Sequence, residues 1–278
     1  EHQFLLEHYQ LDTVGWGSPF LLVPEATSVD TATRKLLAAA KEEDLYLSDI
    51  SPLGIPFNSI KGTTNEFLQA KRISQDKSGS SCPRKYLALN KVSYSKEGIC
   101  TASRKYQTAE LKKLDTEKEQ LTEVAYQFKK DKITEKACLC IGLANASFLE
   151  HDLEIKGEAQ GVVICPGPNI AYFTKEVSLQ KMMNHIYGRE NIIDAENRPH
   201  FFIKELNMYL DHFRKEKKAL EIEDSPMKIK KLAKLQENLL NGIAYYKTMF
   251  ETDTSYFYSE RTKNLKELTI IEKELLVN

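Results

Sequence analysis

The chain has 278 residues, of which 41% are hydrophobic and 28% are charged, so it can bury a sizeable core and does not have a disordered composition. Its 39 basic side chains are balanced by 40 acidic ones without a basic stripe interleaved with aromatic residues, which argues against a nucleic-acid partner. The longest apolar runs are far shorter than the roughly 20 residues that cross a bilayer, so no membrane span is expected.

The five cysteines are an odd number in a chain of this length, and no signal peptide is recognisable at the first residues. Both features favour free thiols in a reducing compartment over a disulfide framework. We therefore expect a cytoplasmic protein.

Residues 1–63 alternate between helix and strand signals. The pattern of 31–41 predicts a helix, and that of 44–48 predicts a strand. Two prolines and a glycine in 51–58 remove backbone donors and helix competence, so this stretch is expected to be an extended loop.

Residues 64–176 read as a cysteine-bearing region of helix and strand. A loop rich in Ser, Gly and Lys is expected over 74–83. Apolar residues at helical spacing predict one amphipathic helix over 108–130, and a second helix is expected over 137–149. The short β-branched run 161–165 is typical of a strand.

Residues 177–278 are expected to form a bundle of three or more packed helices, because apolar stripes at helical spacing recur in three windows. Ser225 followed by Pro226 is a helix start signal, since it combines an N-cap hydroxyl with a proline in the first helical position. The predicted fold class is α+β and predominantly helical, in regions 1–63, 64–176 and 177–278.

The most specific motif runs from Asp12 to Leu21 and reads Asp-Thr-Val-Gly-Trp-Gly-Ser-Pro-Phe-Leu. Glycines beside a small hydroxyl residue expose backbone N–H groups, and such a turn can bind a phosphate. In (βα)8 enzymes the phosphate site commonly lies after the last strands of the barrel.

This arrangement resembles the nitronate monooxygenase (2-nitropropane dioxygenase) family of FMN-dependent barrels, in which a late strand ends in Asp-x-Val-x-x-Gly-Thr-x-Phe, followed by Glu and a small residue. The sequence departs from the family at Gly15, where Gln is frequent, at Pro19, where a basic residue is frequent, and at Asn58, where Arg is usual. The matching positions are Asp12, Val14, Gly17, Ser18 in place of Thr, Phe20, Leu21 and Glu25.

The resemblance implies that residues 1–63 form the end of a (βα)8 barrel and that Gly15, Gly17 and Ser18 contribute to an FMN site. It also implies a small-molecule substrate, with the cofactor carrying out the oxidoreductase chemistry. The family's earlier strands and general base have no counterpart here. The chain is therefore expected to be the C-terminal portion of a flavoprotein, incomplete as an enzyme, with the missing N-terminal part as its partner.

The cysteines form a second set of candidate functional residues. Buried thiols without a metal are the favoured interpretation, because free cysteine is among the most buried residue types. The alternative is a zinc or iron–sulfur site, for which Cys82, Cys138, Cys140 and Cys165 are the candidate ligands. A non-catalytic helical interaction domain is a third hypothesis.

Overall fold

The computed structural model describes residues 2–82, 84–193, 200–252 and 257–277. These residues are mostly helical with a few short strands, which confirms the predicted α+β, predominantly helical class. None of their helices combines the length and the apolar character that are needed to cross a membrane. The chain divides into two compact units: a mixed unit of residues 16–185 and 190–193, and a helical unit of residues 1–15, 186–189 and 194–278.

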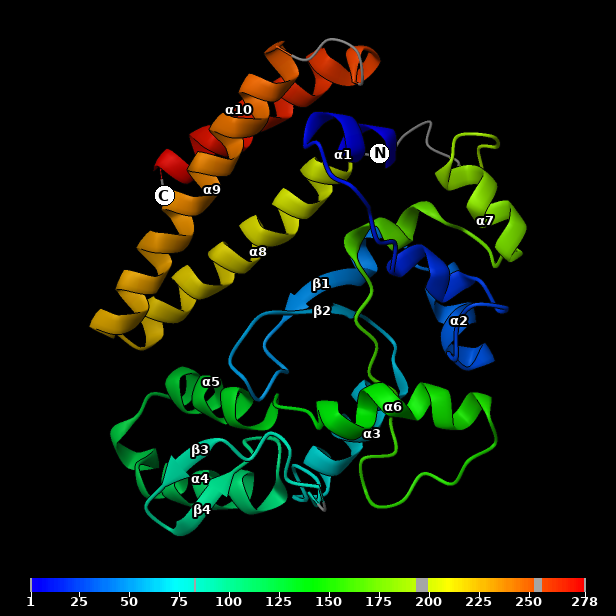
Figure 1. Cartoon of the computed structure of the whole chain (residues 1–278). Coiled ribbons are helices and arrows are strands. Elements are labelled where there is room, and N and C mark those ends of the chain that lie inside the picture. Colours follow the sequence, from blue (N-terminus) through cyan, green and yellow to red (C-terminus); the bar gives the residue numbers. More distant parts are fainter. Residues whose placement is uncertain (1, 83, 194–199, 253–256, 278) are drawn as a thin grey trace. The chain divides into compact units, whose positions relative to one another are not determined.

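The helical unit confirms the predicted bundle at the end of the chain. Figure 1 shows α8 and α9 as a helical hairpin, and α10 packs against both of them. Pro226 is the first residue of α9, as the start signal predicted. The elements of this unit are α1 (His2–His8), α8 (Phe201–Ile222), α9 (Pro226–Thr252), the short 3-10 helix η5 (Tyr258–Glu260) and α10 (Arg261–Val277).

The core of the helical unit consists of the apolar stripes of α8, α9 and α10, with Phe4 of α1 added to them. Burying an apolar side chain stabilises the fold by about 1.5–3 kcal/mol relative to leaving it exposed. The buried members are Phe4, Phe202, Ile203, Leu206, Leu210, Phe213, Leu239, Ile243, Met249, Phe250, Leu268, Ile271 and Leu275.

The mixed unit contains the remaining helices and all the described strands. Its helices are α2 (Thr31–Ala38), α3 (Thr64–Ser74), α4 (Arg104–Thr116), α5 (Glu123–Thr134), α6 (Leu139–Glu150) and α7 (Leu179–Ile186), whose last residue belongs to the helical unit. Its strands are β1 (Leu45–Ser48), β2 (Phe57–Ile60), β3 (Asn90–Val92) and β4 (Ser95–Ile99). The 3-10 helices are η1 (Ser18–Leu22), η2 (Glu42–Asp44), η3 (Lys118–Gln120) and η4 (Pro168–Tyr172).

The strands form two antiparallel pairs, β1 with β2 and β3 with β4. In the first pair Leu45 faces Ile60 and Ser48 faces Phe57, so the loop predicted over 51–58 connects the strands but ends one residue before Phe57. A (βα)8 barrel is built from parallel strands. The expected barrel end therefore remains a hypothesis supported by the sequence motif alone.

The prediction of a strand over 161–165 is wrong, because residues 161–164 are buried but the segment belongs to no sheet. Its N–H groups are bound instead at the ends of helices: Val162 N–H donates to Thr64 Oγ1 at 2.8 Å, and Val163 N–H donates to the carbonyl of Gly142 at 2.9 Å. The β-branched pattern correctly predicted that the segment is buried. It wrongly predicted that a neighbouring strand binds the backbone N–H groups.

The single helix predicted over 108–130 is also wrong, since the chain forms α4 and α5 with η3 between them. Thr122 is the N-cap of α5, and its hydroxyl accepts the Ala125 N–H at 3.2 Å. This cap offers the backbone an alternative to a continuous helix, although the apolar spacing runs across the break.

Candidate functional site

Four cysteines of the mixed unit form the candidate site. Cys82 lies in the loop after α3, Cys100 follows β4, and Cys138 and Cys140 lie at the start of α6. Cys82 raises the pKa of each of the other three thiols, and both α6 cysteines raise that of Cys100. The four thiols therefore lie in one region of the mixed unit.

A short backbone ladder brings the first two cysteines together. Ser80 N–H donates to the Ala102 carbonyl at 3.2 Å, and Arg104 N–H donates to the Ser80 carbonyl at 3.0 Å. Gly79 makes this approach possible, because its φ is +74° and a Cβ there would lie 2.7 Å from the Arg104 nitrogen. The segments on either side of the ladder carry Cys82 and Cys100.

A buried glutamine connects this ladder to α6. The side chain of Gln107 is fully buried, and its Nε2 donates to the carbonyls of Thr101 at 3.3 Å and Lys136 at 3.0 Å. Thr101 follows Cys100 directly, and Lys136 lies two residues before Cys138. Gln107 therefore fixes the spacing between the second and third cysteines.

Burial is the largest cause of the raised pKa values of Cys100, Cys138 and Cys140, and it raises the pKa of Cys100 to about 11. Polar hydrogens oppose this effect and lower each pKa. The neighbouring polar groups are the Ala102 backbone at Cys100, the Ile141 backbone and Ser80 at Cys138, and the Leu87 backbone at Cys140.

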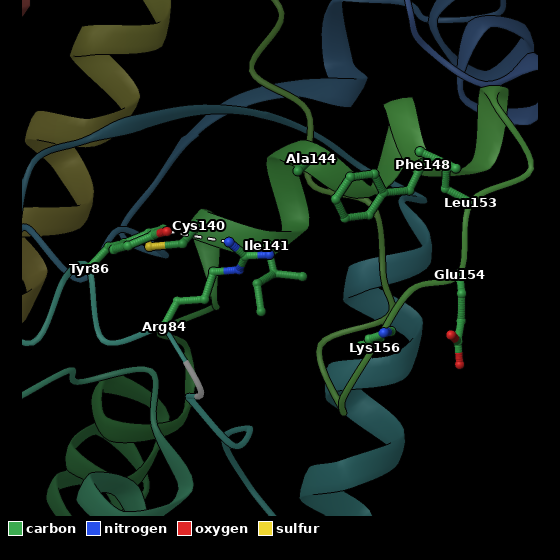
Figure 2. Close-up of a pocket in the computed structure, with 9 residues that line it drawn as sticks. All are labelled: Arg84, Tyr86, Cys140, Ile141, Ala144, Phe148, Leu153, Glu154 and Lys156. Atoms are coloured by element: carbon green, nitrogen blue, oxygen red, sulfur yellow. Dashed lines mark hydrogen bonds between the residues drawn. The ribbon is translucent and has the colours of Figure 1, made fainter.

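Two cavities border the cysteines. Cys82 and Cys100 line one of about 190 Å³, together with Lys85, Arg104 and Lys105. Cys140 lines a larger one of about 810 Å³ beside α6, which Figure 2 shows. Cavities therefore border this group of cysteines on two sides.

The four clustered cysteines differ from the four candidate ligands suggested by the sequence. Cys165 is exposed, and the backbone of Asn58 in β2 lowers the pKa of its thiol, whereas no other cysteine contributes to that pKa. Cys100 takes its place in the cluster. The local signal for Cys100 is its position between β4 and Ser103, the N-cap of α4, where the chain turns sharply.

The predicted flavin turn is a 3-10 turn tied to a second turn. Gly15 ends the first segment of the helical unit, whereas Gly17 and Ser18 begin η1 in the mixed unit. A Cβ on Gly15 or Gly17 would meet nothing within 4 Å. Ser18 Oγ accepts the N–H of Gly167 at 2.7 Å, and Gly167 is the N-cap of η4. The Ser18 hydroxyl can still donate its own hydrogen to an acceptor.

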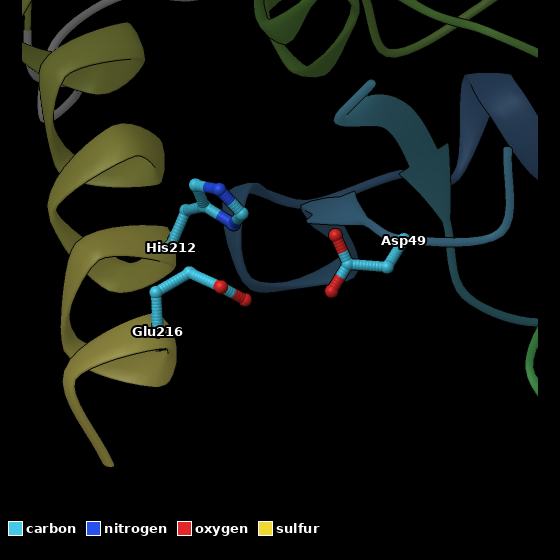
Figure 3. A group of neighbouring side chains, drawn as sticks. All are labelled: Asp49, His212 and Glu216. Atoms are coloured by element: carbon cyan, nitrogen blue, oxygen red, sulfur yellow. The ribbon is translucent and has the colours of Figure 1, made fainter. Parts of the chain in front are cut away.

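Figure 3 shows three further side chains with metal-ligand chemistry. His212 and Glu216 lie one helical turn apart on α8 in the helical unit. Asp49 belongs to the mixed unit, where its carboxylate accepts a hydrogen bond from the Lys132 ammonium at 2.9 Å. Two side chains of one unit are fewer than the three protein ligands that a zinc site commonly has, so we assign no site to this pair.

Comparison of the chain with family models, with curated proteins and with solved structures finds no match. The resemblance to nitronate monooxygenases thus has the motif residues as its only support. An assignment of function depends on the chemistry of the sites themselves.

Proposed function

We propose that the mixed unit binds an iron–sulfur cluster of the [4Fe–4S] class through Cys82, Cys100, Cys138 and Cys140. One observation carries the proposal: cysteines from three separate segments converge, and specific polar contacts hold those segments together. Thiols that only fill a core need no such convergence.

The cysteine sulfurs do not have the spacing of a closed zinc site. Zinc–thiolate bonds of about 2.3 Å in a tetrahedron place the sulfurs about 3.8 Å apart. Among the described residues, no three cysteine sulfurs lie within 4.8 Å of one another. In a [4Fe–4S] cluster each thiolate binds a different iron, so the sulfurs stand farther apart.

When bound, such a cluster supplies one-electron transfer, and the chain supplies ligands, hydrogen bonds and charge. The side chains of Lys85, Arg104 and Lys105 line the cavity beside Cys82 and Cys100, where Lys85 pairs with Glu97 of the same lining and Arg104 pairs with Glu158. Lys105 adds a positive charge that would partly offset the negative charge of the thiolates. All five cysteines are free thiols, which fits the reducing cytoplasm that we infer as the compartment.

The test is the metal content of the protein after anaerobic reconstitution with iron and sulfide. We expect a brown protein that contains iron and acid-labile sulfide in equal amounts and that loses both in the Cys138→Ser variant. Zinc bound stoichiometrically in place of iron would contradict the cluster. Retention of the iron by the Cys138→Ser variant would contradict the ligand assignment.

We propose flavin binding at Gly17 and Ser18 as a second candidate function, in which this chain forms part of an FMN-dependent oxidoreductase resembling nitronate monooxygenases. The supporting observation is the open space beside Gly17, since a phosphate needs close approach to the backbone. The Ser18 hydroxyl would donate to the same phosphate. Two or three such hydrogen bonds contribute about 1.5–3 kcal/mol each, which is too little to hold the cofactor without walls for its ring.

The open space makes Gly17→Val a clean test. Because a Cβ at this position meets nothing within 4 Å, the variant should melt at the same temperature as the parent chain. We expect this chain to be colourless when purified and to bind FMN only weakly, as measured by quenching of the flavin fluorescence, and we expect Gly17→Val to abolish that binding. Unchanged FMN affinity in a folded Gly17→Val variant would exclude the turn as the phosphate site.

A further inference from the structure

The cavity of about 810 Å³ beside α6 has the volume of a small-molecule site, since such sites commonly measure about 300–1,000 Å³. One wall is a face of α6: Ile141, Ala144 and Phe148 follow one another at helical spacing. Leu153, in the loop after α6, lies on the same cavity and is 56% exposed. The cavity therefore offers an apolar surface to a ligand.

Charged side chains lie at the edge of this apolar surface. Arg84 and Lys156 are cationic and Glu154 is anionic, so the lining carries a net positive charge. Figure 2 shows Arg84 reaching toward Ile141, with Glu154 on the opposite side of the cavity. Within the described part of the chain, Arg84 donates to the Tyr86 hydroxyl at 3.3 Å, and neither cation forms an ion pair.

We propose that this cavity binds a small organic acid with an apolar body. Its carboxylate would accept a bidentate pair of hydrogen bonds from the Arg84 guanidinium, a geometry that arginine provides and lysine does not. Its apolar body would lie on Ala144 and Phe148 of α6. Lys156 adds a second positive charge, and the thiol of Cys140 forms part of the same lining.

This binding site does not require the metal centre, but it places a bound acid beside one of its proposed ligands. Cys140 belongs both to the cysteine cluster and to the lining of the cavity. If the cluster is present, the ligand is next to it and is a candidate substrate or effector. If the cysteines hold no metal, the binding of the acid is unaffected.

The experiment is a titration of the full chain with octanoate, followed by calorimetry, with octanol and octyltrimethylammonium as uncharged and cationic comparisons. We expect saturable binding of octanoate and much weaker binding of the other two. Arg84→Gln should weaken binding about ten-fold or more, whereas Lys91→Gln, which removes an exposed charge from β3, should not. Ala144→Phe should cover the apolar wall on which the ligand lies and weaken binding strongly, whereas Leu143→Phe, on the exposed side of α6, should not.

The same titration is repeated on metal-free protein and on the Cys82→Ser variant, so that failure of the cluster and failure of the acid site can be told apart. If Arg84→Gln and Ala144→Phe weaken binding and the control variants do not, the site is established whatever the metal content. Absence of saturable octanoate binding, equal affinity for the cationic analogue, or equal losses in the control variants would overturn it.

Discussion

His200 is a buried histidine that should make the helical unit sensitive to acid. Its side chain is 5% exposed and packs against four aromatic rings. Its Nδ1 accepts the Phe202 N–H at 3.3 Å as the N-cap of α8, which requires that nitrogen to carry no proton. Burial lowers the pKa of His200 from 6.5 to about 4, although the half-exposed carboxylate of Glu260 lies 3.8 Å from Nε2.

The magnitude follows from linkage between protonation and folding. A depressed pKa means that the unfolded chain takes up the proton first, so stability is full above about pH 6.5 and is lost as the pH falls toward 4. The difference between the two pKa values of His200 corresponds to about 3 kcal/mol. This loss is a large fraction of the 5–15 kcal/mol that typically stabilises a folded protein.

The assay compares urea unfolding of the parent chain and of His200→Asn at about pH 7, 5.5 and 4. Asparagine is also a preferred N-cap, so the variant keeps an acceptor at the start of α8 and removes the titration. The loss of the ring contacts of His200 does not depend on pH, so it cancels when the pH values are compared. We expect the difference in stability between the two proteins to change by about 3 kcal/mol across this range in favour of the variant. His151→Asn, which replaces an exposed histidine, should leave the pH dependence unchanged. An NMR titration that gave His200 a pKa of 6.5 or higher would refute the reasoning.

Three further predictions concern the mixed unit. Gly161→Ala should lower its melting temperature sharply, because a Cβ there would lie 2.3 Å from the Asn65 Cα, whereas Gly17→Ala should not; equal melting temperatures would contradict this packing. Gln107→Leu should cost about 1–3 kcal/mol per carbonyl left without a donor and should reduce the iron retained after reconstitution; iron retention equal to that of the parent chain would show that the bridge is dispensable. Acidification from about pH 8 to 6 should speed bleaching of a reconstituted cluster, because protons compete with iron for the cysteine thiolates; a rate independent of pH would contradict this.

The sequence predicted α8, α9 and α10 well, because their apolar residues recur at helical spacing and these helices pack on one another. It did not predict that α1 belongs to the same unit or that most of α7 belongs to the mixed unit. Residues 31–41 and 137–149 likewise contain α2 and α6 nearly at the predicted bounds. Predictions from the spacing of apolar residues were wrong where a local polar contact determines the secondary structure. Thr122 starts a new helix within a continuous apolar stripe, and Thr64 supplies the partner that a neighbouring strand would have supplied to the segment after α6.

The cysteine cluster could be predicted only in part. Cys82, Cys138 and Cys140 were recognisable as possible ligands, and Cys138 proves to be the N-cap of α6 and not part of its body. The choice between Cys100 and Cys165 depends on a tertiary contact, the Gln107 bridge, which leaves no periodic signal in the sequence. The spacing of residues along the chain does not predict which distant segments a buried glutamine side chain connects.

The most direct test of the cluster is therefore the contrast between those two cysteines. Iron and acid-labile sulfide are measured after reconstitution in Cys100→Ser and in Cys165→Ser, with the melting temperature of each variant as the control for folding. We predict that Cys100→Ser loses the cluster while Cys165→Ser retains the full complement of iron and sulfide. Loss of iron in Cys165→Ser with full retention in Cys100→Ser would contradict the proposed ligand set.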